Sequence, residues 1–311
     1  MTDPAAAVLR QTIVMFIIVI IGALCYKFRL INDEGRKQLS ALVLNVVNPL
    51  LIFLSYQTEM RAELIEGFLW VALMAAATYI LFILLAPLFF GKKGPARAVI
   101  EKFSVIYSNC GFMGTPLILG VFGAEGVFIQ TGFVTAFNLF VWTHGVMSIS
   151  GERDRKTVLR ALRSPALIAV AAGLICFFTG LRLPEIAFSA LNNVAEMTTP
   201  LAMIVAGASI MSAGLLKSVK NLRVYFVSAV RLAVLPLAGF ALTAFLPCED
   251  VPKLIALICF SCPTAAIGTM FAIKYERDSE YAAQIFAVST LLSMVTLPLM
   301  TSLGTAVLEL I

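Results

Sequence analysis

Residues 108–120 read SNCGFMGTPLILG and lie in the middle of an apolar stretch that runs from Val99 to Val121. A stretch of this length is enough to cross a bilayer, yet it carries Ser, Asn, Gly, Thr and Pro at half its depth. Backbone groups freed by such a break are tolerated in lipid only where they line a cavity or pack on protein. The stretch therefore predicts a helix broken inside the membrane, with Thr115 capping a half-helix that starts at Pro116.

A second break is predicted at Ser261-Cys262-Pro263, inside an apolar stretch of residues 252–274. Proline is tolerated at the start of a helix, because its missing N–H would be unpaired there anyway, and Ser261 or Cys262 would then be the cap. Both breaks fall near mid-membrane. We expect the two broken helices to cross and to aim their positive N-terminal ends at one point, which suits a carboxylate.

The composition places the whole chain in the membrane. Of its 311 residues 60% are hydrophobic and 13% are charged, and the mean hydropathy is +0.95. We therefore predict an all-α polytopic membrane protein. Ten transmembrane helices are expected, at residues 7–26, 38–57, 65–90, 99–121, 125–148, 164–181, 188–214, 222–246, 252–274 and 279–305.

The basic residues predict the topology. The odd-numbered connections hold 18 of the 23 Lys and Arg residues, and such loops face the cytoplasm. We expect an integral protein of the inner (plasma) membrane of a bacterium, with both termini outside. The net charge of +5 follows from this topology and gives no indication of nucleic-acid binding.

Four short matches predict an internal duplication. Gly22 and Cys25 align with Gly173 and Cys176, and the offset between all matched pairs is 151–155 residues. The other matches are Pro49 with Pro200, SNC (108–110) with FSC (260–262), and Glu125 and Gln130 with Glu280 and Gln284. Each half (1–150 and 151–311) would hold five spans, so the second copy would be inverted, as in many secondary transporters.

Several segments resemble the auxin efflux carrier family in its bacterial, malonate- or malate-type form, within the bile acid/sodium symporter-like superfamily. These segments are LVLNVVNPLLIF, SNCGFMGTPLILGVFG, TTPLAMIVAGASI, CPTAAIGTMFAIKY and VSTLLSMVTLPL, and the likeness covers essentially all ten spans. The resemblance implies two inverted five-helix repeats with broken, crossing helices 4 and 9. It also implies a scaffold of helices 1, 2, 6 and 7, a mobile core of helices 3–5 and 8–10, and a homodimer formed through the scaffold.

The resemblance also implies a substrate site. Asn109 matches an asparagine that contacts the substrate carboxylate, and Pro116 and Pro263 match the prolines of the breaks. Gln130 and Asn138 fall near cavity-lining positions. The full predicted substrate-binding set is Ser108, Asn109, Cys110, Gly111, Thr115, Pro116, Gln130, Asn138, Cys262, Pro263 and Thr264.

Ion coupling is left open between protons and sodium. Thr131 and Thr135, with Ser108 and Asn109, resemble part of a sodium site in the bile acid branch. That branch has an acidic residue near the second break, whereas this chain has CPTAAIGT there. A site without a carboxylate binds sodium weakly, so we rank proton coupling or facilitated diffusion higher.

Three ionisable residues within the predicted spans are further candidates for coupling. Glu196 is a proton-coupling group, or a residue that reaches water from near its helix end, or the ion-pair partner of Arg231. Arg231 either attracts the anion or pairs with Glu196. His144 is the only histidine; it is either a proton relay or an interface anchor beside Trp142.

The sequence favours a secondary transporter that moves a small organic anion, a mono- or dicarboxylate, by elevator-type alternating access. The alternatives are a sodium-coupled symporter of bile acid-like anions and a ligand sensor built on a transporter fold. An enzyme is not expected, because no catalytic set is present, and no cofactor or metal is expected. The Cys259-x-x-Cys262 spacing is interpreted as coincidence, since no second pair accompanies it.

Overall fold

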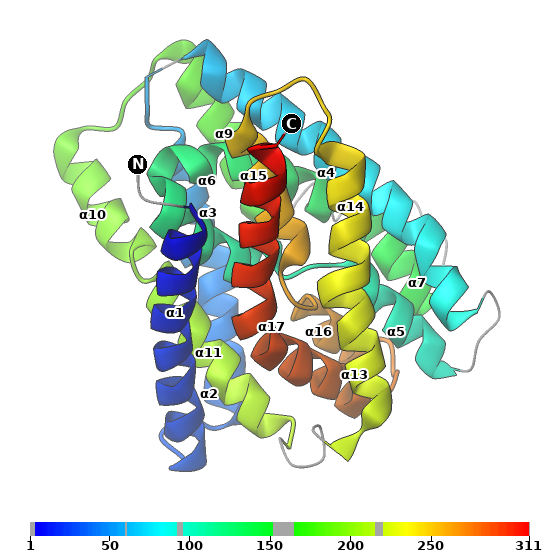
Figure 1. Ribbon diagram of the computed structural model, residues 1–311. Helices are drawn as coiled ribbons and strands as arrows, with labels where there is room; N and C mark the ends of the chain where they lie inside the picture. The colour runs from blue at the N-terminus through cyan, green and yellow to red at the C-terminus, as the bar shows by residue number, and fades with distance from the viewer. Residues whose placement is uncertain (1–3, 60, 92–95, 152–164, 215–219, 311) are drawn as a thin grey trace.

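The computed structural model describes residues 4–59, 61–91, 96–151, 165–214 and 220–310, and in these residues it is helical without a named strand (Figure 1). The α-helices are α1 (Pro4–Lys27), α2 (Asp33–Leu42), α3 (Asn48–Ser55), α4 (Ala62–Phe90), α5 (Ala96–Ile106), α6 (Thr115–Phe140), α7 (Val146–Ser150), α9 (Pro165–Thr179), α10 (Glu185–Ala195), α11 (Thr198–Ser212), α13 (Leu222–Ala229), α14 (Leu235–Thr243), α15 (Asp250–Ser261), α16 (Ile267–Lys274) and α17 (Ser279–Leu308). Four π-helical turns join some of them: η1 (Val43–Val47), η2 (Cys110–Gly114), η3 (Val141–Gly145) and η4 (Val230–Val234).

Seven helical runs of the described residues are long and apolar enough to cross a membrane, and α9 is a shorter apolar helix. The longest run, Cys110–Ser150, contains a non-helical residue, Gly123, with φ of 66°. This kink lies between the fourth and fifth predicted spans. The prediction of a polytopic all-α membrane protein is confirmed, whereas the count of ten spans stays a prediction.

Three of the π-helical turns directly precede a helix with proline in its first turn. Pro49, Pro116 and Pro236 follow η1, η2 and η4. Because proline has no N–H, it leaves a carbonyl of the preceding turn without its usual partner, and a wider turn accommodates that change. These three prolines therefore coincide with the wider, π-helical turns.

Two pairs of helices pack along one side of the molecule. Helix α1 lies along α11, and α3 lies along α9. At the first crossing, a Cβ added to Gly22 would meet the Ile204 carbonyl oxygen at 2.3 Å, and one added to Gly207 would meet that of Val19 at 1.9 Å. Only glycine permits this approach, as at other close crossings of membrane helices.

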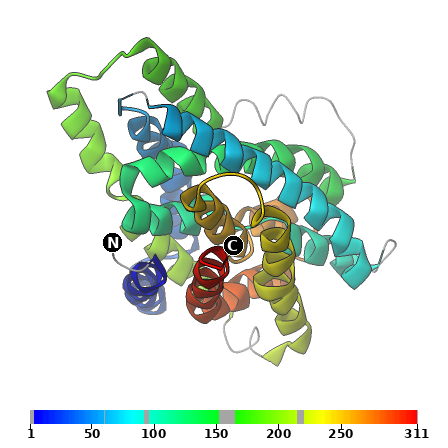
Figure 2. The ribbon, with the colours of Figure 1, turned by 45° about the horizontal axis from the view of Figure 1, so that its top comes forward.

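The other long helices pack on one another and on the first pairs, since α17 also contacts α1 and α11, and α6 contacts α1 and α3. Helix α4 runs past both α6 and α15, and α17 packs on α13 and α15 (Figure 2). Helix α10 packs on α3 and lies at the periphery (Figures 1 and 2). Both termini lie at the end of the molecule opposite the connection from α1 to α2 (Figure 1).

An ion pair between buried Glu101 and half-exposed Arg223 links three helices. The Glu101 side chain, 4% exposed, accepts hydrogen bonds from Arg223 Nε at 2.8 Å and Nη2 at 3.0 Å. The Tyr281 hydroxyl donates a third, at 2.8 Å. Sequence reasoning missed Glu101, which lies near the edge of a predicted span. Helices α5, α13 and α17 are thereby joined at one end.

Candidate functional site

The two predicted breaks meet in the structure. Ser108 and Thr264 form an isolated antiparallel β-bridge. The Asn109 amide donates to the Pro263 carbonyl at 2.7 Å, and the Ala265 amide donates to the Tyr107 carbonyl at 2.9 Å. We call these two interruptions, residues 107–109 and 262–266, the crossing. The hydrogen bonds satisfy backbone groups that would otherwise be unpaired at membrane depth.

The half-helices begin at other residues than the sequence predicts. The first resumes at Cys110, with Asn109 as N-cap, so Thr115 lies one turn inside the helix and caps nothing. The second resumes at Ile267 with Ala266 as N-cap, and Ser261 is the last residue of the preceding helix. The predicted caps were wrong because pairing between the two breaks holds Pro263 and Thr264 in extended backbone.

An unsatisfied donor lies at the start of the first half-helix. Asn109 is 5% exposed, and its Nδ2 is buried with no hydrogen-bond partner among the described residues. The first amides of a helix, here those of Cys110 and Gly111, also lack intrahelical partners. A Cβ added to Gly111 would have nothing within 4 Å. Buried donors beside open space at a helix N-terminus can bind an anion.

Arg231 lies on the other side of the crossing and is fully buried. Its guanidinium donates to the carbonyls of Val105 at 2.7 Å, Ile106 at 3.4 Å and Cys262 at 3.1 Å, and to that of Phe260. These carbonyls end α5 and α15, where helix dipoles are negative. Arg231 therefore compensates the C-terminal ends of both broken helices at once.

The predicted ion pair between Arg231 and Glu196 is wrong. Glu196 is exposed at the C-cap of α10, where it accepts a hydrogen bond from Asn192 at 2.9 Å. Arg231 points to the crossing, and α10 packs on α3. The physical reason is that backbone carbonyls, which a sequence does not reveal as ligands, satisfy the buried charge.

Side chains of α6 extend the site on one side. Gln130, 1% exposed, donates from Nε2 to the Cys110 carbonyl at 2.8 Å and so holds the first half-helix in place. Thr135 and Asn138 instead donate to carbonyls of α6 itself. Thr131 hydrogen-bonds the hydroxyl of Tyr56, at the end of α3.

Tyr107, a residue that sequence reasoning missed, links His144 to the crossing. Its hydroxyl lies 2.9 Å from His144 Nδ1 and donates to the Phe140 carbonyl at 3.0 Å. Its own carbonyl accepts the bond from Ala265. The signal in the sequence was a tyrosine directly before SNCG.

A polar stripe on α17 was missed as well. Ser289, Thr290 and Ser293 are fully buried, and Ser289 Oγ accepts a hydrogen bond from the Thr264 amide at 3.3 Å. Their signal was three hydroxyl residues at helical spacing in an apolar run. Within the described ranges no group of three His, Cys, Asp or Glu side chains could hold a metal ion, and the cysteines there are free.

Comparisons with known proteins agree with this architecture. The family described as membrane transport protein matches residues 7–301. The chain is 27% identical over 290 residues to an uncharacterized transporter of Methanothermobacter thermautotrophicus, covering 92% of this chain and 94% of that protein. It is also 27% identical over 303 residues to an uncharacterized transporter of Methanocaldococcus jannaschii, covering 92% and 96%. The chain belongs to the membrane transport protein family of auxin efflux carriers, and it is an integral membrane transport protein rather than an enzyme.

Proposed function

We propose that the protein is a secondary transporter of a small organic anion, a mono- or dicarboxylate, which binds at the crossing. The observation that carries this proposal is the unpaired, buried Nδ2 of Asn109 beside the open space at Gly111. A carboxylate oxygen would accept from Nδ2 and from the first amides of the half-helix. Both the hydrogen bonds and the helix dipole would favour the negative charge.

The proposed mechanism is elevator-type alternating access by two inverted repeats. In support, the pairing of α1 with α11 and of α3 with α9 joins predicted helices 1 and 7, and 2 and 6, as two exchanged copies would. The close bonding of α5, α13 and α17 through Glu101 favours a core that moves as one body. The scaffold would then stay in place while the core moves, and its exposed surface would be available for a homodimer.

The coupling ion is proposed to be a proton, if transport is coupled at all. No Asp or Glu occurs in residues 102–124 or 251–275, which contain both breaks. Hydroxyl and carbonyl oxygens alone would hold sodium weakly. The link from His144 through Tyr107 to the crossing offers an imidazole, a side chain that can take up and release protons. Sodium-dependent binding of an amphipathic anion would instead favour the bile acid-like alternative.

The protein is proposed to lie in the plasma membrane with both termini outside. The support is the concentration of Lys and Arg in the odd-numbered connections. Reporter fusions at the two ends and at residue 151 would test this orientation.

Uptake of labelled malonate and indole-3-acetate into proteoliposomes tests the function. We expect Asn109→Ala to abolish transport, because the unpaired side-chain amide at the half-helix start is removed, while its thermal unfolding stays unchanged. Asn193→Ala, on exposed α10, is the matched control and should transport normally. Wild-type rates in Asn109→Ala would overturn the proposed site, and a wild type that moves neither probe would overturn the proposed substrate class.

A further inference from the structure

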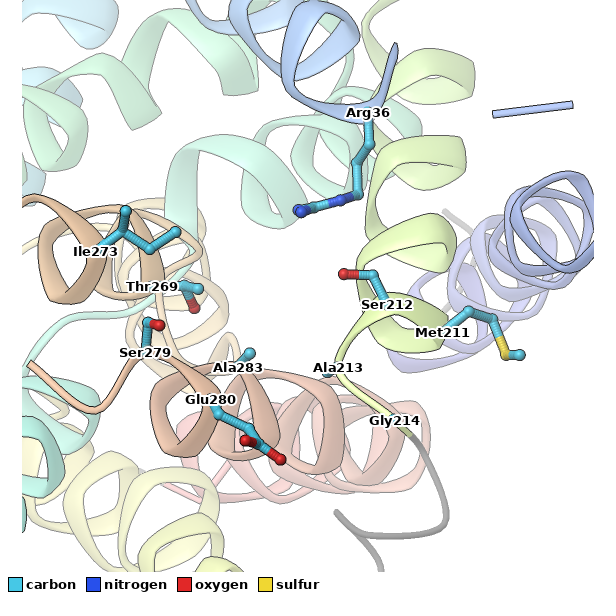
Figure 3. Close-up of a pocket in the computed structure, with 10 residues that line it drawn as sticks. All are labelled: Arg36, Met211, Ser212, Ala213, Gly214, Thr269, Ile273, Ser279, Glu280 and Ala283. Carbon is cyan, nitrogen blue, oxygen red and sulfur yellow. The ribbon is translucent and has the colours of Figure 1, made fainter. Parts of the chain in front are cut away.

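A cavity lies away from the crossing. It has a volume of about 720 Å³ and is bounded by α2, the C-terminal end of α11, α16 and the N-terminal end of α17 (Figure 3). Pockets of about 300–1,000 Å³ suit small organic ligands. No residue of the crossing lines it. By the predicted topology it opens to the cytoplasm.

Arg36 is the one basic residue among the side chains that line this cavity. Its guanidinium projects from α2 into the space (Figure 3). Nε is buried and has no acceptor in the described part of the chain. Nη1 lies 3.5 Å from Ser209 Oγ, and Nη2 lies 3.3 Å from Asp33 Oδ1. A guanidinium has five donors, so most of its hydrogen-bonding capacity is unused.

The two existing contacts of Arg36 compete weakly with a ligand. Both are longer than the usual 2.7–2.9 Å of a charge-assisted hydrogen bond. Asp33 is 62% exposed, and exposed ion pairs contribute little to stability. A carboxylate could therefore bind the two Nη atoms in a bidentate manner without breaking a strong interaction.

We propose that Arg36 binds the carboxylate of the transported anion in this cavity, before the anion reaches the crossing. This inference rests on the proposed function and adds a second binding site for the anion. Ser212, Thr269 and Ser279 line the same cavity and supply neutral hydroxyls for the rest of the ligand. The acidic Glu280 lies on the opposite wall from Arg36 (Figure 3), so the carboxylate binds on the α2 side.

The walls of the cavity belong to different predicted parts. Arg36 and Ser212 lie on helices of the predicted scaffold, and Thr269, Ser279 and Glu280 lie on helices of the predicted core. Movement of the core therefore changes the cavity. Arg36 contributes to the affinity for the anion in the cavity, whereas Asn109 contributes to the affinity for the anion at the crossing.

The test compares the full-length wild type with Arg36→Gln, Arg36→Lys and Lys37→Gln. Lys37 is exposed on the same helix and does not line the cavity, so Lys37→Gln removes the same charge as a matched control. Binding of malonate and of indole-3-acetate is measured by ligand-dependent thermal stabilisation. Transport is measured separately in proteoliposomes.

We expect Arg36→Gln to weaken binding of at least one probe by about tenfold or more, because a charge-assisted bidentate contact is lost. Arg36→Lys should recover part of the affinity, and Lys37→Gln should match the wild type. Equal affinities in Arg36→Gln and Lys37→Gln would overturn the inference, as would a wild type that neither probe stabilises. Failure of the proposed function appears in the transport assay instead, as normal transport by Asn109→Ala or none by the wild type.

Discussion

At the residue scale, Arg231 is the clearest case of a charge buried for structural reasons. It is fully buried and donates to four carbonyls at the ends of α5 and α15. A buried charge is stable when it is fully hydrogen-bonded, and helix C-termini favour cations. One side chain therefore holds both broken helices.

Arg231→Met should destabilise the protein by about 3 kcal/mol or more, since several buried carbonyls lose their donor. The stability of Arg231→Lys should lie between that of Arg231→Met and that of the wild type, because one ammonium group cannot reach the carbonyls of two helix ends. Thermal unfolding in detergent measures the effect. Arg10→Met, on the exposed face of α1, is the control. Equal melting temperatures for Arg231→Met and Arg10→Met would contradict this account.

Gly111 gives a second prediction at the residue scale. A Cβ there would have nothing within 4 Å, whereas one at Gly114 would lie 3.3 Å from Gln130 Nε2 and 3.4 Å from Cys262 Sγ. Gly111→Leu should therefore fold normally and reduce transport by about tenfold or more, because its side chain occupies the ligand's space. Gly114→Leu should instead unfold at lower temperature. Normal transport by Gly111→Leu would place the substrate elsewhere.

At the element scale, the sequence predicted that the helices break but not where they resume. SNCGFMGTP and SCPT stand out against apolar surroundings, which is enough to predict an interruption. The restarts at Cys110 and Ile267 depend on pairing between Ser108 and Thr264. These residues are far apart in the chain, so local propensity carries no signal of their contact.

The crossing of α1 and α11 yields a prediction about this element pair. Gly207→Val should lower the free energy of unfolding by about 2 kcal/mol or more, since its Cβ would lie 1.9 Å from the Val19 carbonyl oxygen and the helices would have to separate. Ala171→Val adds apolar atoms to an exposed position on α9 and should leave the free energy of unfolding nearly unchanged. Denaturant or thermal unfolding measures both. A Gly207→Val protein as stable as Ala171→Val would mean that the helices do not approach so closely.

At the scale of the whole molecule, the sequence predicted the class, the family and the existence of a crossing, but not the partners of isolated charges. An ion pair between Glu196 and Arg231 was one of the alternatives that the sequence left open. In the structure, Arg231 is satisfied by carbonyls and Glu196 by Asn192. The cavity beside Arg36 arises where α2, α11 and the consecutive helices α16 and α17 meet, three places distant in sequence, so composition and spacing alone could not locate it.

Side-chain contacts join three helices at the end of the molecule opposite this cavity. Arg36 and Tyr56 lie near opposite ends of the helical run Asp33–Ser55. The Tyr56 hydroxyl hydrogen-bonds Thr131 of α6. The Tyr56 ring lies 4.6 Å from Phe128, and Phe128 lies 4.9 Å from Phe177 of α9. Helices α3, α6 and α9 are therefore joined at this end.

Under the proposed alternating access, Tyr56→Phe should shift the protein away from the state described here, because it removes the hydrogen bond and keeps the aromatic packing. One such bond contributes about 1 kcal/mol, which corresponds to about a fivefold change in the ratio of two states. In a Ser212→Cys background, the cavity would then close more often, and a water-soluble maleimide should label position 212 more slowly. Thr131→Val should slow labelling equally, and the double variant should add nothing further, since both remove the same bond. Unchanged labelling in Tyr56→Phe, with wild-type thermal stability, would show that this contact does not hold the cavity open.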